Sequence, residues 1–268
     1  METMLNINFA AADSFLNVND QVGISFFVAT MIMMASAVFF FMERGNVKGK
    51  WRTSVTVAGL ITGIAAIHYL YMRDMWVDSY NASEMMQKCL MKAADADAAA
   101  ACEGQGSSPT VFRYVDWFIT VPLQIIEFYL ILAAIAVVPR ALFWRLMIAS
   151  LVMLVGGYVG EAGMIPAALG FAVGMAGWIY IIYEVFAGEA SKINAGSANA
   201  ASQKAFHALR LIVTVGWAIY PLGYALGYMA GSASPDALNI IYNYADLINK
   251  TAFGLVIWAA AVADSQEA

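Results

Sequence analysis

Ile241-Tyr-Asn-Tyr-Ala-Asp-Leu-Ile-Asn-Lys250 is the stretch that decides the fold, because it places two charges inside a long apolar segment. That segment runs from about residue 237 to 263, and a helix needs roughly 20 apolar residues to cross a bilayer. Asp246 and Lys250 are four residues apart, so their side chains share a helix face. A charged group at mid-membrane costs at least ~2.5–3.5 kcal/mol, so we expect it to have a partner and a function.

The amine of Lys250 suggests a specific chemistry. A lysine held in an apolar site is a usable nucleophile, and its natural product with an aldehyde is a Schiff base. The competing interpretation is a structural ion pair between Asp246 and Lys250. Buried ion pairs are weak evidence of function, so the pair alone does not decide between the two.

The composition indicates a polytopic membrane protein. Of the 268 residues, 62% are hydrophobic and 12% are charged, whereas soluble domains carry roughly 25% charged residues. The net charge of −5 indicates no particular partner, and the absence of a basic patch argues against a nucleic-acid-binding protein. No Lys or Arg precedes Arg44, so the N-terminal segment lacks the basic region of a typical signal peptide.

Seven apolar segments predict an all-α fold, a bundle of seven transmembrane helices. The predicted spans are 21–42, 53–72, 110–138, 146–160, 167–186, 206–229 and about 237–263. We expect an exposed tail over 1–20, a seven-helix domain over 21–264 and a short tail over 265–268. A long polar loop is predicted over 74–108, a basic turn over 140–145 and a Gly/Ala/Ser-rich loop over 188–204.

The basic residues of the loops predict the orientation. Loops carrying more Lys and Arg stay on the cytoplasmic side. Eight such residues lie in the first, third and fifth connections: Arg44, Lys48, Lys50, Arg52, Arg140, Arg145, Lys192 and Lys204. The second connection and its edge hold only Arg73, Lys88 and Lys92, and the sixth holds none. The N-terminus is therefore predicted outside and the C-terminus inside.

The third predicted span carries charges in a row. Asp116 and Glu127 are eleven residues apart, which returns to nearly the same face about 16 Å further along a helix. Thr120 lies between them, and Arg113 precedes them on the outer side. Intramembrane carboxylates in a row favour a proton relay. The alternative is that they only make hydrogen bonds between helices.

These residues resemble the microbial rhodopsins, and within that family the proteorhodopsins. Arg113-Tyr-Val-Asp-Trp-Phe-Ile-Thr-Val-Pro-Leu-Gln-Ile-Ile-Glu127 is similar to the third helix of the family, and Asp246 to Lys250 to its seventh. Four further stretches resemble its other helices: His68–Arg73, Gly156–Gly163, Trp178–Glu184 and Trp217–Tyr224. The resemblance covers the chain from about residue 21 to 258. Any one of these motifs is weak, but the Asp/Thr/Glu spacing together with Asp-x-x-x-Lys is specific.

The resemblance implies a role for each matching residue. Lys250 would bind all-trans retinal covalently as a Schiff base, with Asp116 as counterion and proton acceptor and Asp246 as second counterion. Glu127 would be the cytoplasmic proton donor, while Arg113, His68 and Thr120 tune the counterion. For His68 the alternative is a polar side chain satisfied within the bundle. No metal site is expected.

Two further features belong to the implied retinal pocket. Its wall would be formed by Trp117, Trp178, Trp217, Tyr220, Pro221 and Tyr224; aromatic stripes otherwise serve packing. Gln124 matches a position where, in proteorhodopsins, Leu accompanies green absorption and Gln accompanies blue, so the resemblance implies a blue-absorbing pigment. The alternative for Gln124 is a packing amide without spectral effect.

The implied function is light-driven outward proton transport, not enzyme catalysis. The resemblance also implies a multi-pass protein of the bacterial inner membrane, with the lipid bilayer and protons as partners, that assembles as a homo-oligomeric ring of five or six subunits. The alternatives are a sensory rhodopsin that signals through a partner and a light-driven pump for another ion. Sensors often lack the inner carboxyl donor, and sodium pumps typically carry Gln at the position of Glu127.

The loop over 74–108 departs from the family because it is longer than the expected hairpin. It includes a plausible short amphipathic helix, 83–92, and both cysteines of the chain, Cys89 and Cys102. On the outer, oxidising side disulfides persist. A disulfide between these cysteines and two free thiols both remain open.

Overall fold

The fold is described by a computed structural model that places residues 16, 18–92, 109–196 and 199–266. Within these ranges the chain is helical and contains no strand, and seven helical segments are long and apolar enough to span a membrane. The helices are α1 (Gln21–Glu43), α2 (Gly49–Lys92), α4 (Thr110–Ala133), α5 (Arg140–Glu161), α6 (Ala167–Phe186), α7 (Glu189–Ala195), α8 (Ala200–Leu211), α9 (Ile219–Tyr224) and α10 (Pro235–Gln266). The predicted seven-helix bundle is confirmed.

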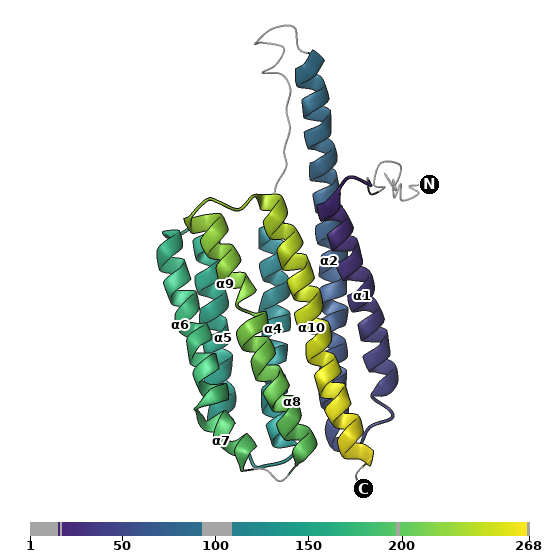
Figure 1. The fold of residues 1–268 in the computed structure, drawn as a ribbon, viewed down its shortest axis with the longest axis vertical. Coiled ribbons are helices and arrows are strands. Elements are labelled where there is room, and N and C mark those ends of the chain that lie inside the picture. Colours follow the sequence, from purple (N-terminus) through teal and green to yellow (C-terminus); the bar gives the residue numbers. More distant parts are fainter. Residues whose placement is uncertain (1–15, 17, 93–108, 197–198, 267–268) are drawn as a thin grey trace, which may run out of the picture.

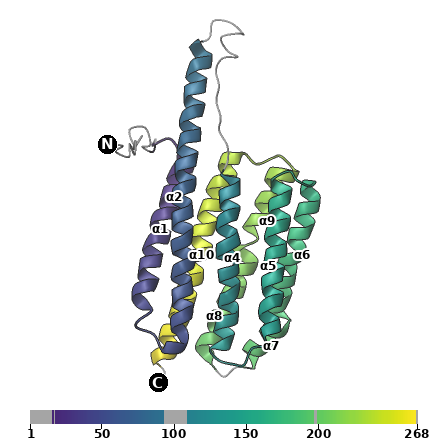
Figure 2. The same cartoon turned by 180° about the vertical axis from the view of Figure 1, so that it is seen from behind.

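The helices are arranged with α1 and α2 on one flank of the bundle and α5 and α6 on the other, as Figures 1 and 2 show from opposite sides. Between these flanks, α10 packs against α1, α2, α8 and α9, and α4 packs against α2 and α5. The C-terminal end of α2 extends beyond the rest of the bundle (Figure 1). The residues of α4 and α10 therefore face each other inside a ring of helices.

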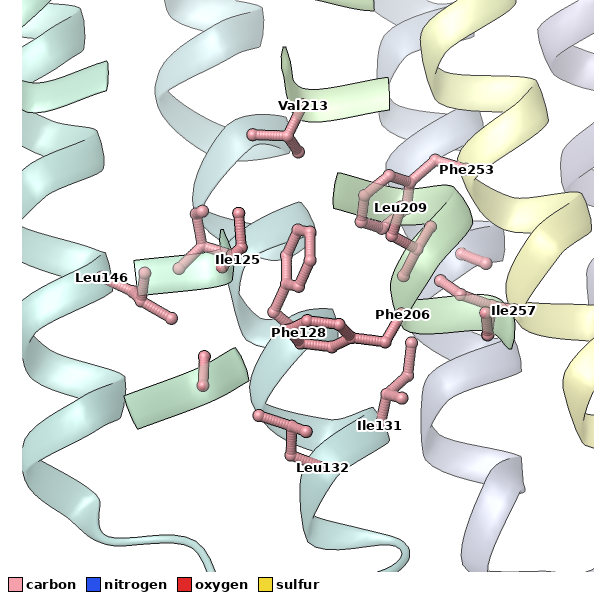
Figure 3. Close-up of a cluster of buried hydrophobic side chains, with 14 of the residues drawn as sticks. Ile125, Phe128, Ile131, Leu132, Leu146, Phe206, Leu209, Val213, Phe253 and Ile257 are labelled. Carbon is pink, nitrogen blue, oxygen red and sulfur yellow. The ribbon is translucent and has the colours of Figure 1, made fainter. Parts of the chain in front are cut away.

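Phenylalanine rings form a buried cluster between α4, α8 and α10 (Figure 3). Phe128 of α4 meets Phe206 of α8 and Phe253 of α10 edge to face, with ring centroids 5.7 and 5.9 Å apart. All three side chains are fully buried, and Ile131 and Ile257 extend the cluster. These apolar side chains pack α4, α8 and α10 against one another (Figure 3).

Glycine allows α5 and α6 to approach closely, as small residues do between membrane helices. A Cβ atom on Gly156 would lie 2.6 Å from the backbone nitrogen of Gly174. One on Gly170 would lie 2.6 Å from the Cα of Gly160. Larger side chains would push the two helices apart.

Each end of the bundle is fixed by a buried aspartate. Asp20 caps α1 by accepting from the Gly23 backbone nitrogen at 2.8 Å, and also accepts from Trp76 Nε1 of α2 at 3.0 Å. At the other end, Asp264 of α10 pairs with Lys50 at 2.9 Å and accepts from Trp51 Nε1 at 2.9 Å. Asn199, the cap of α8, also donates to Asp264.

The second helix is longer than predicted. The predicted span ends at Met72 and is followed by a predicted loop that includes residues 74–92, but α2 continues without a break to Lys92. No Gly or Pro occurs from Ile64 to Glu103 to stop it, and Met, Gln, Lys, Leu and Ala favour a helix. The expected short helix over 83–92 is thus the end of α2. The side chains of Cys89 and Cys102 lie outside the described ones, so the alternatives of a disulfide and two free thiols are not tested.

Two other predicted connections are partly helical. Residues 140–145, taken as a basic turn, form the start of α5, and much of 188–204 forms α7 and the start of α8. The third helix instead ends earlier than predicted, at Ala133. Charged residues mark where a helix leaves the hydrocarbon core, not where its hydrogen bonds end, so a charge-based boundary can be several residues off.

The sixth span is not a regular α-helix. Two π-helical segments, Ile212–Gly216 and Ala225–Met229, flank α9, which contains Pro221. Proline lacks the N–H that a helix needs at this position, so the hydrogen-bond ladder must shift around it. The distortion of this span takes the form of two π segments.

Candidate functional site

The amine of Lys250 lies in the middle of the bundle between two carboxylates. Its Nζ is 2.7 Å from Asp246 Oδ2 on the same helix and 3.0 Å from Asp116 Oδ2 on α4. The side chains are 3%, 1% and 0% exposed. One cation between two buried anions requires further donors to balance the charge.

Asp246 accepts hydrogen bonds from three side chains besides Lys250. Tyr69 Oη donates to its Oδ2 at 2.7 Å, Tyr220 Oη to its Oδ1 at 2.5 Å, and Trp117 Nε1 to its Oδ2 at 3.0 Å. Together with Lys250, four groups from four elements hold this carboxylate. Hydrogen bonds to an ionised acceptor are stronger than those between neutral groups, so this network holds the Asp246 side chain firmly in place.

Asp116 is held less tightly. His68 Nδ1 of α2 lies 3.1 Å from its Oδ1. Thr120 Oγ1 lies 3.4 Å from its Oδ2 but is closer, at 3.0 Å, to the Asp116 backbone carbonyl. Of the two carboxylates beside Lys250, Asp116 thus has fewer hydrogen-bond donors.

Arg113 acts on this site through Tyr69. Its guanidinium donates to Tyr69 Oη at 3.0 Å and to the side-chain oxygens of Asn239 and Asn243 at 2.9 Å each. Among the described residues no carboxylate lies within ion-pair distance of Arg113. The link from Arg113 to Asp246 therefore runs through Tyr69.

A cavity with about 790 Å³ of space free of protein atoms, part of it open to solvent, has Lys250 and Asp246 in its wall. Its wall is mostly aromatic, aliphatic and glycine, with few polar groups at defined places, which is typical of a site for an apolar ligand. All six predicted pocket residues line it: Trp117, Trp178, Trp217, Tyr220, Pro221 and Tyr224. A long apolar aldehyde with its reactive end at the amine fits this shape, so the residues present fit retinal.

Gln124 also lines the cavity. Its side chain is 2% exposed, and its Nε2 has no hydrogen-bond partner in the described part of the chain. An amide dipole that is not engaged by protein groups acts on whatever occupies the cavity.

Glu127 of α4 is not among the residues that line the cavity with Lys250. Its side chain is fully buried, and neither carboxyl oxygen has a hydrogen-bond partner by distance and angle within the described ranges. The nearby polar group that interacts with the Glu127 carboxyl is the hydroxyl of Ser54, a buried residue of α2. The next residue, Phe128, belongs to the cluster of Figure 3.

Side chains of the cavity region satisfy the backbone carbonyls freed by the first π segment. Asn249, next to Lys250, donates from Nδ2 to the Gly216 carbonyl at 3.1 Å. Trp178 donates from Nε1 to the Val213 carbonyl at 2.9 Å. The distorted helix is thereby tied to α10 and α6.

Several groups of the site were missed by sequence reasoning. Tyr69, Asn239, Asn243 and Asn249 are neutral side chains, and a neutral polar residue in an apolar helix carries no strong pattern of its own. A usable signal existed for Asn243, which precedes Lys250 by seven residues and so falls on the same helix face. Tyr69 follows His68 directly within a stretch already singled out.

Comparisons with known proteins agree with this geometry. The family model for bacteriorhodopsin-like protein matches residues 20–263. Over 263 residues the chain is 49% identical to the blue-light absorbing proteorhodopsin of Gamma-proteobacterium Hot 75m4, covering 97% of this chain and 94% of that one. It is 47% identical over 261 residues to the green-light absorbing proteorhodopsin of Gamma-proteobacterium EBAC31A08, with the same coverage. The crystal structure of blue light-absorbing proteorhodopsin from Med12 is similar at 54% identity and a TM-score of 0.73, covering 91% of this chain and all of that one.

Proposed function

Because this chain belongs to the bacteriorhodopsin-like family, we propose that it carries retinal on Lys250 and uses light to move protons out of the cell. When bound, retinal supplies the light absorption and the change of shape that alters the environment of Nζ. The observation that carries the proposal is the buried amine in the wall of an apolar cavity, 3.0 Å from Asp116 Oδ2. The free amine of Lys250 occupies the place of the Schiff-base nitrogen.

Asp116 is the proposed proton acceptor. Its Oδ2 is within direct transfer distance of Nζ, and its other oxygen faces His68. Asp246 accepts three hydrogen bonds from Tyr69, Tyr220 and Trp117 and would lose them in part on protonation. Asp246 is therefore proposed as the permanent counterion.

Glu127 is the proposed proton donor. It lies on α4 eleven residues after Asp116 and on nearly the same face of the helix. In this proposal Asp116 and Glu127 lie on opposite sides of Lys250 along the bundle. Its apolar surroundings keep a proton on the carboxyl until Nζ needs one. Acceptor and donor on opposite sides of Lys250 give the transport a direction, and the Lys and Arg distribution supports an outward one.

The experiment that tests the function is illumination of a suspension of cells that express the protein with retinal. We expect the medium to acidify in the light and the signal to vanish when a protonophore is added. Passive proton flow driven by sodium export would instead increase with the protonophore. A slow photocycle without acidification would indicate a sensor, and either result would contradict the proposal.

Replacing Glu127 with glutamine should leave the colour nearly intact and slow the return of a proton to Nζ by on the order of 10²-fold, because only the positioned donor is lost. Protons must then come from the cytoplasm, so the rate should fall in proportion to proton concentration. Flash absorption spectroscopy at several pH values measures this. Glu189→Gln, which removes a partly exposed carboxylate paired with Arg145 outside the cavity, is the control and should keep the rate. An unchanged rate in Glu127→Gln would count against its role as donor.

Replacing Gln124 with leucine should shift the absorption to longer wavelength. Excitation moves positive charge along the polyene, and the unpartnered amide in the cavity wall stabilises the two charge distributions differently. The identities to blue- and green-absorbing relatives, 49% and 47%, are too close to decide the colour, so the blue assignment depends on Gln124. Met153→Leu, an apolar exchange in the same wall, should barely move the spectrum. Spectra at one alkaline pH test this, and an unmoved Gln124→Leu band would refute it.

The assembly and location of the protein follow from the same family membership. We propose a homo-oligomeric ring of five or six subunits in the bacterial inner membrane, since rings are a usual closed symmetry. Residues 21–264 form the membrane domain in this proposal, with 1–20 outside and 265–268 inside. Native mass spectrometry in mild detergent tests the ring, and monomers alone would reject it.

A further inference from the structure

A carboxylate that the proposed proton path does not use also lines the cavity. Glu161 is the last residue of α5, and it shares the cavity wall with Lys250. Tyr114 Oη of α4 donates to its Oε1 at 3.0 Å. The carboxyl group is thus held in place by a buried phenol that is itself 4% exposed.

Glu161 lines the cavity from α5, whereas Lys250 lines it from α10. Lys250 is on α10, whereas α5 and α6 form the far flank of the bundle in both views (Figures 1 and 2). The path between them runs through Tyr114, whose ring meets Trp117 at 5.0 Å, and Trp117 donates to Asp246 beside Lys250. A carboxyl group therefore lines the cavity on the α5 side, apart from the aspartates beside Lys250.

The groups that face Glu161 are nearly all neutral phenols. Tyr114 and the cation Arg113 come from α4. Tyr224 comes from α9, Tyr228 from the π-helical segment Ala225–Met229, and Tyr242 from α10. The described cavity residues of α6 are not titratable. Arg113 donates hydrogen bonds to Tyr69, Asn239 and Asn243. Glu161 is consequently the one carboxyl group of the described residues on this side of the cavity.

We propose that Glu161 is a second charge that tunes the absorption of the bound chromophore, from the α5 side of the cavity. This inference rests on the proposed function, because it requires retinal on Lys250. Excitation moves positive charge away from Nζ along the polyene. An anion at the far end stabilises the excited state more than the ground state, so ionised Glu161 lowers the excitation energy and shifts the band to longer wavelength.

The sign of this shift separates Glu161 from Asp116. An anion beside Nζ stabilises the ground state, so ionisation of Asp116 on raising the pH shifts the band to shorter wavelength. Ionisation of Glu161 shifts it the other way. The two carboxylates therefore produce opposite colour changes along one pH titration.

The test is a titration of the visible spectrum in the dark with the Asp116 contribution removed. In purified Asp116→Asn protein with retinal, we expect raising the pH from acid to alkaline to move the band to longer wavelength in one transition. In the double variant Asp116→Asn with Glu161→Gln, we expect that transition to be lost and the band to stay near the acid position of the single variant. A transition that survives in the double variant, or none in the single variant, overturns the inference while the pigment itself still supports the proposed function.

An infrared measurement keeps the inference testable if the double variant binds no retinal. Acidification of the Asp116→Asn pigment should produce a protonated-carboxyl C=O band whose midpoint equals that of the colour change. A colour change whose midpoint matches no such band overturns the assignment to Glu161. If neither wild-type protein nor any variant binds retinal, the proposed function itself fails, which is a different outcome.

Discussion

Replacing Lys250 with alanine should give a protein with no visible absorption after retinal is added. Lys250 is the lysine at the cavity, with a buried Nζ between Asp116 and Asp246. Without that amine no covalent link to an aldehyde can form there, so the loss of pigment should be complete. Absorption spectra of the purified variant after incubation with retinal measure this directly.

Two variants keep this prediction interpretable. Alanine leaves two buried carboxylates without their cation, and breaking such a pair costs roughly 3–5 kcal/mol, so folding must be checked by circular dichroism. Lys250→Arg keeps a cation beside both carboxylates but offers no primary amine, so it should fold and still remain colourless. Lys50→Ala, which removes a half-exposed lysine that pairs with Asp264, should keep the pigment. A visible band in either Lys250 variant would end the assignment.

The fold was predictable because the membrane imposes a strong pattern on the chain. Uninterrupted apolar segments of the right length have no stable alternative to helices in hydrocarbon, so seven spans could be read from composition along the sequence. The helix ends could not, because hydropathy reports where the hydrocarbon ends. For that reason α2 continues to Lys92 and α5 begins at Arg140, both well beyond the predicted spans.

The charged part of the site was equally predictable. A buried charge is costly, so Asp116, Glu127, Asp246 and Lys250 stand out in apolar helices, and their spacing relates them to one another. Their neutral partners do not stand out. Nothing in the sequence indicates that Asp246 would receive three donors while Asp116 would receive fewer, because that difference depends on how four helices meet. The π segment tied to Asn249 is likewise a tertiary feature.

Replacing Asp116 with asparagine should stop light-driven proton export and shift the pigment to longer wavelength. The amide that replaces the carboxylate 3.0 Å from Nζ cannot take up a proton, and the anion that stabilises the ground state is gone. Asp246 remains beside Nζ, so the pigment should still form. Proton release by illuminated cells should therefore fall to the level of the Lys250 variants, although the visible band persists.

The comparison of the two carboxylates makes the Asp116 result decisive. Asp116→Glu keeps a carboxyl group on α4 and should retain part of the export, which separates loss of the acceptor from a general disturbance of the site. Asp246→Asn removes the more strongly bonded anion, so it should disturb the dark spectrum as well as transport, because Tyr69, Trp117 and Tyr220 lose the acceptor they share. If Asp116→Asn exported protons in the light while Asp246→Asn did not, the roles of acceptor and fixed counterion would have to be exchanged. The geometry argues against that outcome, since a proton moves to the base with fewer donors, and that base is Asp116.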